Sequence, residues 1–178
     1  MAGSHSGSDV RVAAVILALA IGPGPAATQD ISLEYRVKAA YLYNFVKFVQ
    51  WPQDAREGPV NICIAGRNPF GTVLAETINE ESIDGRMLTS RVILEPEPDC
   101  HVLFVPEGAS GAYLRAARGT STLTVGETDD FLDQGGVITF VKEGRNVRFA
   151  ISTGAADQAR LRVSSRLLQL AINTRGKR

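Results

Sequence analysis

The sequence predicts an α/β fold: a three-layer α/β/α sandwich with a mostly parallel central sheet and an antiparallel C-terminal hairpin. Three observations predict it. Short apolar segments such as 60–66 and 101–106 alternate with amphipathic segments along the chain. The apolar segments 136–141 and 146–151 are separated only by KEGR, the spacing of a tight hairpin. The composition, 44% hydrophobic with no net charge over 178 residues, is typical of one globular domain.

The chain begins with a segment that we interpret as an export signal rather than as part of the domain. Residues 12–21, VAAVILALAI, are ten apolar residues after Arg11, and Gly-Pro-Gly-Pro and two small residues follow. A membrane-spanning helix needs about 20 apolar residues, whereas the core of a signal peptide needs about 7–15. We therefore expect residues 1–27 to be a signal peptide and residues 28–178 to form a single domain in an oxidising compartment.

The first element of the domain is predicted to be an aromatic helix that ends at Trp51, because the residue before a proline avoids the helical conformation. Its polar arc is narrow, so the helix should be buried by more than one neighbour, either within the chain or in a second molecule. We expect contacts with a partner or a second copy at Tyr43, Lys47 and Trp51. One core-facing stripe is predicted to contain Val37, Ala40, Tyr41, Phe45 and Phe48, and a second side Leu42, Val46 and Val49.

The later elements follow in alternating order. Residues 60–66 are predicted to form a strand and 68–81 a helix, with Asn68 as N-cap and Pro69 in its first turn. A turn is expected at 83–86, and Ser164 is expected to cap a final amphipathic helix with Leu167, Leu168 and Ala171 on one face. Between these lie expected strands at 89–95, 101–106 and 121–127, a helix at 110–119, a helical turn at 128–134 and the hairpin strands 136–141 and 146–151.

The chain contains two cysteines, Cys63 and Cys100. An even number of cysteines in an exported chain favours a disulfide bond. The alternative is a pair of buried free thiols that act as small apolar side chains.

The residues that support catalysis or metal binding are few, and we expect neither an enzyme nor a cofactor. His101 is the one histidine beyond the expected leader, and it lies next to Cys100 at the start of an apolar strand. One histidine and two cysteines do not supply the three or four ligands of a zinc site. The zero net charge, with basic and acidic residues interspersed, argues against nucleic-acid binding.

One local arrangement could hold a small ligand. The segment AGRNPFG, residues 65–71, is predicted to join the carboxyl end of a strand to the amino end of a helix, where open α/β sheets bind ligands and free N–H groups can receive an anion. Arg67 and Asn68 are the candidate ligand-binding residues.

An ordered set of segments resembles the YfiR family of exported bacterial proteins. The segments cover nearly all of the expected domain, from about residue 34 to residue 171. They are VKAAYLYNFVKFVQWP, ICIAGRNPFG, INEESIDGRML, CHVLFVP, LTVGETDDFLDQGGVITFV and NVRFAISTGAADQARLRVSSRLLQLA.

The resemblance implies a periplasmic α/β protein that forms a dimer and holds an inner-membrane signalling protein, such as a diguanylate cyclase, inactive through its periplasmic sensor domain. It also implies an outer-membrane lipoprotein that can draw the repressor away, and it matches Cys63 and Cys100 to the core disulfide of the family. A sensor kinase is another possible membrane partner, and a periplasmic small-ligand module is the alternative function. The best-known members carry a second cysteine pair near the C-terminal hairpin, where this chain has no cysteine.

Overall fold

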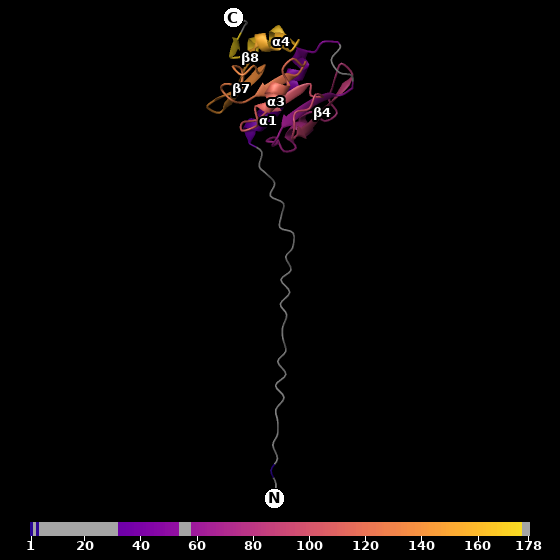
Figure 1. Ribbon diagram of the computed structural model, residues 1–178, viewed down its shortest axis with the longest axis vertical. Coiled ribbons are helices and arrows are strands. Elements are labelled where there is room, and N and C mark those ends of the chain that lie inside the picture. Colours follow the sequence, from indigo (N-terminus) through magenta and orange to yellow (C-terminus); the bar gives the residue numbers. More distant parts are fainter. Residues whose placement is uncertain (2, 4–31, 54–57, 176–178) are drawn as a thin grey trace.

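The computed structural model of the chain describes residues 1, 3, 32–53 and 58–175 (Figure 1). The expected signal peptide, residues 1–27, lies outside this part of the chain except for residues 1 and 3. None of the helices in the described part is long and apolar enough to cross a membrane.

An eight-stranded sheet forms the middle layer. Only β7–β8 and β3–β4 are antiparallel neighbours in it, and the other neighbouring strands are parallel, which confirms the predicted fold class. In spatial order the strands are β10 (Asn173–Arg175), β8 (Asn146–Ser152), β7 (Ile138–Glu143), β6 (Leu123–Gly126), β5 (Val102–Val105), β2 (Val60–Ala65), β4 (Arg86–Ile93) and β3 (Ser82–Ile83).

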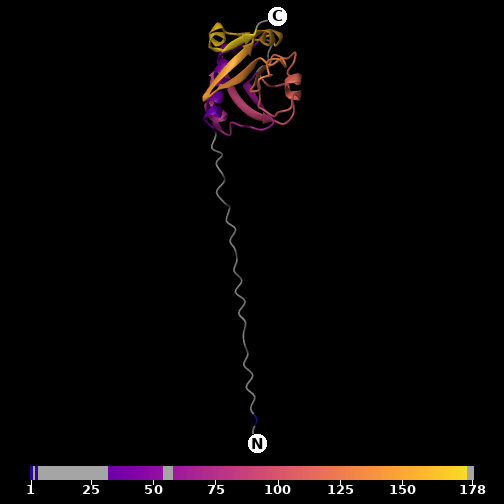
Figure 2. The same ribbon diagram turned by 90° about the vertical axis from the view of Figure 1, so that its left-hand side faces the viewer.

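Helices cover both faces of the sheet, and Figure 2 shows α1 and α3 on opposite sides of it. The cluster of buried side chains on the α1 face is the larger one, and a second cluster surrounds α3 and the two cysteines. The helices are α1 (Leu33–Phe48), α2 (Val73–Thr77), α3 (Ala112–Ala116), α4 (Thr153–Gln158) and α5 (Ser165–Leu170), and β1 (Val49–Gln50) pairs with β9 (Arg162–Val163) in a separate ribbon.

Both predicted turns are tight. In the β3–β4 hairpin, Ile83 pairs with Arg86, and the two residues between them, Asp84 and Gly85, have φ values of +53° and +75°. Two consecutive residues with positive φ match the right-handed twist of the flanking strands. The β7–β8 hairpin turns at residues 144–145, two residues where KEGR suggested four, because the pairing continues as far as Glu143 and Asn146.

The aromatic helix α1 ends three residues before the predicted position. Val49 is extended and pairs with Val163, and Gln50 pairs with Arg162. The proline at 52 restricts only the residue before it. The earlier stop at Phe48 therefore comes from a strand pairing with a segment more than 100 residues away.

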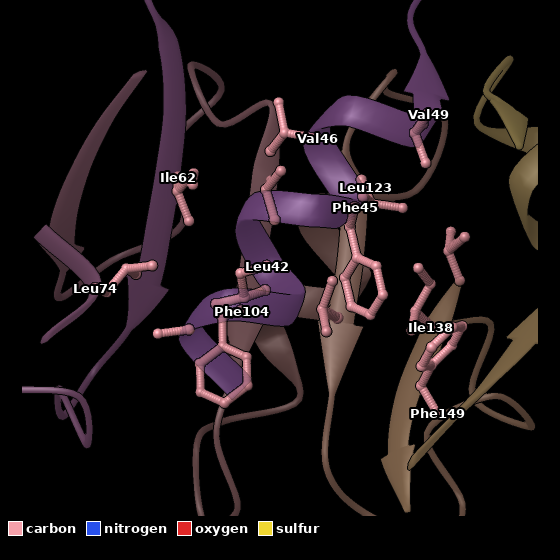
Figure 3. Close-up of a cluster of buried hydrophobic side chains, with 14 of the residues drawn as sticks. Leu42, Phe45, Val46, Val49, Ile62, Leu74, Phe104, Leu123, Ile138 and Phe149 are labelled. Carbon is pink, nitrogen blue, oxygen red and sulfur yellow. The ribbon is translucent and has the colours of Figure 1, made fainter. Parts of the chain in front are cut away.

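The buried face of α1 is also rotated from the predicted stripe. Ala40 is exposed and Val37 is half-buried, whereas Ala39, Leu42 and Phe45 have no exposed area. Figure 3 shows Leu42 and Phe45 directed toward the sheet strands that carry Phe104, Ile138 and Phe149. The centres of the Phe45 and Phe149 rings lie 5.1 Å apart, and the rings pack edge to face.

The neighbours of α1 lie within the same chain. Beyond the sheet, α1 contacts α2 on one side and α5 on the other. These contacts account for a helix that is apolar over more than one side, so the second predicted neighbour does not have to be another molecule.

The helix predicted at 68–81 is much shorter, since α2 begins only at Val73. Asn68 is not its N-cap. Its side-chain oxygen accepts the Phe70 N–H at 2.9 Å, and its amide nitrogen donates to the Gly71 carbonyl at 2.9 Å. Asn side chains stabilise such turns in place of a helix start.

The helix predicted at 110–119 is also shorter in the structure, where only α3 is helical. The C-terminal segment, predicted to end in one helix, contains α4, β9, α5 and β10. Ser164 caps α5 as expected, accepting the Leu167 N–H at 3.2 Å, and Leu167 is buried. Leu168 and Ala171 are only partly buried. The helix α4, the strand β9 and the strand β10, which runs parallel to β8, were not predicted.

A disulfide bond joins Cys63 to Cys100, as predicted. Cys63 lies within β2 and Cys100 precedes β5, the neighbouring strand, so the bond links two central strands 37 residues apart in sequence. Both cysteines are buried, Cys63 completely and Cys100 with 1% of its surface exposed. The bond is therefore a structural cross-link that reductants do not reach readily.

Replacing both cysteines with alanine should lower the free energy of unfolding by about 3–4 kcal/mol, the loop-closure value for a loop of this length. Urea denaturation monitored by circular dichroism measures this loss. Dithiothreitol reaches the bond when the chain unfolds in urea, so at equilibrium it should destabilise the wild-type chain by a similar amount and leave the double variant unchanged. Equal stability of the wild-type and double-variant chains would contradict the structural role of the bond.

Candidate functional site

Charged side chains gather at the carboxyl edge of the parallel strands. In the order β4–β2–β5–β6–β7, the chain passes from β2 to β4 on one side and then returns to β5 on the other side of β2, so the order in which strands are added reverses between β2 and β5. Open α/β sheets bind ligands at the carboxyl ends of strands beside such a reversal. A hollow of about 380 Å³ lies at this edge, and Glu34, Tyr35, Lys38, Glu107, Glu127, Phe140, Val141, Lys142 and Val147 line it.

A buried ion pair lies at the centre of this carboxyl-edge cluster. The ammonium of Lys38 in α1 is 2.5 Å from a carboxylate oxygen of Glu127, which follows β6. The two side chains are only 6% and 7% exposed. Glu127 also accepts the N–H of Glu107 at 2.8 Å and the hydroxyl of Tyr35 at 3.2 Å. The carboxylate is therefore held by three donors, two from α1 and one from the loop after β5.

A second, more exposed carboxylate extends the cluster toward solvent. Glu34 accepts from Lys38 at 2.6 Å and from Lys142 at 2.8 Å. The hydrogen bonds from Lys142 and Lys38 lower the pKa of Glu34. Burial and the nearby Glu127 raise the pKa of Tyr35 to about 12, so this tyrosine stays a neutral donor at physiological pH.

Of the two predicted ligand residues, Arg67 lies near this cluster, and the loop that carries both residues is not the helix start that the sequence suggested. Arg67 is exposed, and its charge acts on Tyr35. The N–H groups of Gly66 and Phe70 already donate to the Ile93 carbonyl and to Asn68. With the five-residue α2 starting after this loop, the free helix N–H groups that motivated the prediction are absent from residues 65–71. Whether Arg67 and Asn68 bind a ligand stays a prediction.

The predicted partner-contact residues lie along one side of α1 and its extension. The hydroxyl of Tyr43 donates to Glu81 at 2.5 Å, which raises the pKa of Tyr43, and the Lys47 ammonium lies 4.9 Å from the centre of the Tyr43 ring. Lys47 and Trp51 line one hollow of about 450 Å³. Trp51 also borders a second hollow of about 620 Å³ with Arg160 and Arg162. The structure thus brings all three residues to one surface.

His101 is buried, as expected for a structural residue. Its Nδ1 lies 3.2 Å from the Asn61 N–H, and its ring packs edge to face on Trp51. In the described part of the chain, no group of three or more histidine, cysteine or acidic residues could hold a metal ion.

The carboxyl-edge cluster was not predicted from the sequence. Lys38 lies between apolar residues and was not assigned to any face, and Glu127 belongs to a predicted strand. The only available signal was a charged residue on the apolar side of an amphipathic helix, which requires a buried partner. Sequence spacing does not identify that partner, because it lies 89 residues away.

The chain is similar to a known protein family and to known structures. A sequence model of the YfiR/HmsC-like family matches residues 35–172. A conserved domain protein from Vibrio cholerae O1 biovar El Tor strain N16961 has the same fold, with a TM-score of 0.56 at 10% identity over 79% of this chain. The chain spans 60% of the length of that protein.

A second solved structure, an ABC domain in complex with L-Trp from Streptococcus pneumonia, is less similar. It aligns with a TM-score of 0.46 at 9% identity over 65% of this chain and 55% of its own length. No curated protein matches the sequence.

The buried pair should show strong coupling in a double-mutant cycle. Lys38→Met leaves Glu127 charged and buried, so it should lower the free energy of unfolding by about 3–5 kcal/mol. The double variant Lys38→Met/Glu127→Gln should be more stable than Lys38→Met alone, because no unpaired charge remains. Lys142→Met is the control, because the Lys142 side chain is 66% exposed, and it should change stability by less than about 1 kcal/mol. If Lys38→Met and Glu127→Gln had additive effects on the free energy of unfolding, measured by urea denaturation, the coupling would be contradicted.

Glu34 should contribute to the acid limb of the stability curve. Its pKa is lower in the folded chain than the ordinary value of 4.5, so its stabilisation is present above that value and is lost as the pH falls through the folded-state pKa. Glu34→Gln should therefore lower stability at neutral pH and reduce the loss of stability below about pH 4.5. Thermal melts from pH 7 to pH 3 measure this change. Lys142→Gln should reproduce part of it, and an acid limb identical to wild type in both variants would contradict it.

Proposed function

The chain belongs to the YfiR/HmsC-like family, and from this premise we propose that it is an exported regulatory protein that acts by stoichiometric binding. Its target would be the periplasmic domain of an inner-membrane signalling protein, such as a diguanylate cyclase, which it would hold inactive. The observation that carries the proposal is the family match over residues 35–172, together with the buried disulfide. We also propose export by residues 1–27 and a single domain from residue 28 onward.

The proposed mechanism is a shift between two conformations of the target. A repressor shifts this equilibrium only by the difference between its affinities for the two conformations. A tenfold bias corresponds to about 1.4 kcal/mol, which a few buried aromatic contacts can supply. Catalytic turnover by the chain forms no part of this proposal.

The proposed contact surface consists of Tyr43, Lys47 and Trp51. Tryptophan and tyrosine dominate the energy of many protein interfaces. Here Trp51 lines two hollows that could receive side chains of a partner. The Lys38–Glu127 pair holds the start of α1, and the pairing of β1 with β9 holds its end. A surface fixed at both ends loses little conformational freedom on binding.

Other partners are compatible with the same family. The signalling protein could be a sensor kinase, an outer-membrane lipoprotein could compete for the same chain, and two copies could form a homodimer. The alternative function, a periplasmic small-ligand module, is favoured by one observation: the hollow at the carboxyl edge of the sheet, beside Arg67.

Capture from cross-linked membranes tests the proposal. The tagged chain should recover an integral membrane signalling protein, and Lys47→Glu should reduce this recovery by about tenfold, or about 1.4 kcal/mol. Arg145→Glu is the matched control, because Arg145 is an exposed basic residue of the β7–β8 turn, away from the contact surface. Thermal melts of both variants verify folding.

Failure to recover such a protein, or equal recovery with both variants, would contradict the proposed surface and partner. Retention of a small molecule in native mass spectrometry would favour the ligand-binding alternative. Turnover of a substrate by the purified chain would overturn the regulatory function.

A further inference from the structure

The basic residues of this neutral chain are unevenly distributed. Six of its 19 basic residues and none of its 19 acidic residues follow Asp157. The arginines at 160, 162 and 166 are not adjacent, so they do not form a continuous basic run in the sequence. Arg175, Lys177 and Arg178 complete the set at the C-terminus.

The fold brings the segments after residue 157 to one end of the molecule. Figures 1 and 2 both show the C-terminal elements, in yellow, at the same end. It is the amino edge of the parallel strands, because β8 runs antiparallel to β7 and ends beside the start of β7, where α4 follows it. The carboxyl-edge cluster lies at the opposite edge.

Arg162 and Arg166 are exposed at this end. Arg162 pairs with Gln50 in the β1–β9 ribbon, and the guanidinium carbon of Arg166 lies 5.9 Å from the centre of the Phe48 ring. Asp157 is the exposed carboxylate nearest in sequence, and it lines the same hollow as Arg160 and Arg162. In the described part of the chain, positive charge therefore predominates from Arg160 through β9 and α5, while α4 carries Asp157.

Two large apolar side chains are exposed beside these arginines. Leu170 is 56% exposed and Ile172 is 37% exposed. Arg166 and Leu170 are four residues apart in α5 and therefore lie on the same side of the helix. Apolar side chains surrounded by basic ones are typical of segments that lie on an anionic membrane surface, where the charge attracts and the apolar groups insert.

We propose that this basic end, defined by Arg162, Arg166, Leu170 and Ile172, binds the surface of a bilayer that contains anionic phospholipids. The arginines contact the headgroup phosphates, and Leu170 and Ile172 enter the boundary between headgroups and acyl chains. Arginine suits phosphate because its guanidinium can donate two hydrogen bonds at once. An acidic protein surface would attract the arginines equally but would give the two exposed apolar side chains no matching environment.

Membrane binding would concentrate the chain where a membrane-bound partner is found. It does not depend on the proposed regulatory function, since it needs only lipid and the purified chain. The contact surface at Tyr43, Lys47 and Trp51 is a separate set of residues. Failure of one proposal therefore leaves the other testable.

Vesicle co-sedimentation tests the inference. The processed chain, purified from periplasmic extract, should sediment with vesicles of phosphatidylcholine and phosphatidylglycerol in equal parts and remain in solution with phosphatidylcholine alone. Each basic residue near an anionic surface contributes about fivefold in binding, or about 1 kcal/mol. Arg162→Gln/Arg166→Gln should therefore lower the binding constant for these vesicles about 25-fold. Raising the salt from about 0.1 M to about 1 M should reduce it as well, because the screening length falls from about 10 Å to about 3 Å.

Matched variants control for folding and net charge. Arg91→Gln/Arg145→Gln removes the same charge from exposed residues of β4 and of the β7–β8 turn, and it should bind like wild type. Leu170→Ser should weaken binding, whereas Leu94→Ser, at a leucine that is 81% exposed elsewhere, should not.

Equal sedimentation of the two arginine double variants would overturn the proposal, as would equal binding to both vesicle types. Retention on immobilised polyglutamate without binding to vesicles would overturn it in favour of an acidic protein surface.

Discussion

The position of α1 depends on the pairing of Lys38 with Glu127. A buried ammonium without a partner costs several kcal/mol, so α1 can bury this side of its first turns only where a carboxylate is available. Glu127 is held in that place by Tyr35 and by the backbone of Glu107. Since the cost of desolvation largely offsets the attraction between the two charges, the pair fixes the position of α1 more than it adds to the net stability of the fold. With the start of α1 fixed, Leu42 and Phe45 meet the sheet side chains that complete the core.

The two edges of the sheet have different chemistry. At the carboxyl edge, charged groups are paired with one another over short distances and are largely withdrawn from water. At the amino edge, Trp51 borders two hollows and arginines remain exposed. Groups that are already paired have little left to gain by binding, whereas the half-buried Trp51 and the exposed arginines can still gain contacts with a partner. This division favours the amino edge and the adjoining side of α1 as the surface for partners.

The disulfide and the hairpins were predictable from the sequence because each has a short-range or compositional signal. Two cysteines leave a single intramolecular pairing, which the export expected from the sequence favours, and KEGR between two apolar segments restricts the connection to a hairpin. The end of α1 had no such signal. Val49 leaves the helix because Val163 offers it a strand partner, and the expected stop before Pro52 was therefore too late. At Asn68, a turn and a helix cap use the same side chain, so the residue type alone does not separate them.

The sequence by itself determined the α/β class, the strand and helix alternation, the cysteine pair and the membership suggested by its ordered segments. Periodicity and composition carry this information, because both are properties of neighbouring residues. Only the tertiary structure decided which charges are buried together and which are left exposed. Lys38 meets Glu127, and the arginines after Asp157 share one end, through contacts between distant segments. Such contacts are set by strand order and helix packing, which local sequence patterns do not encode.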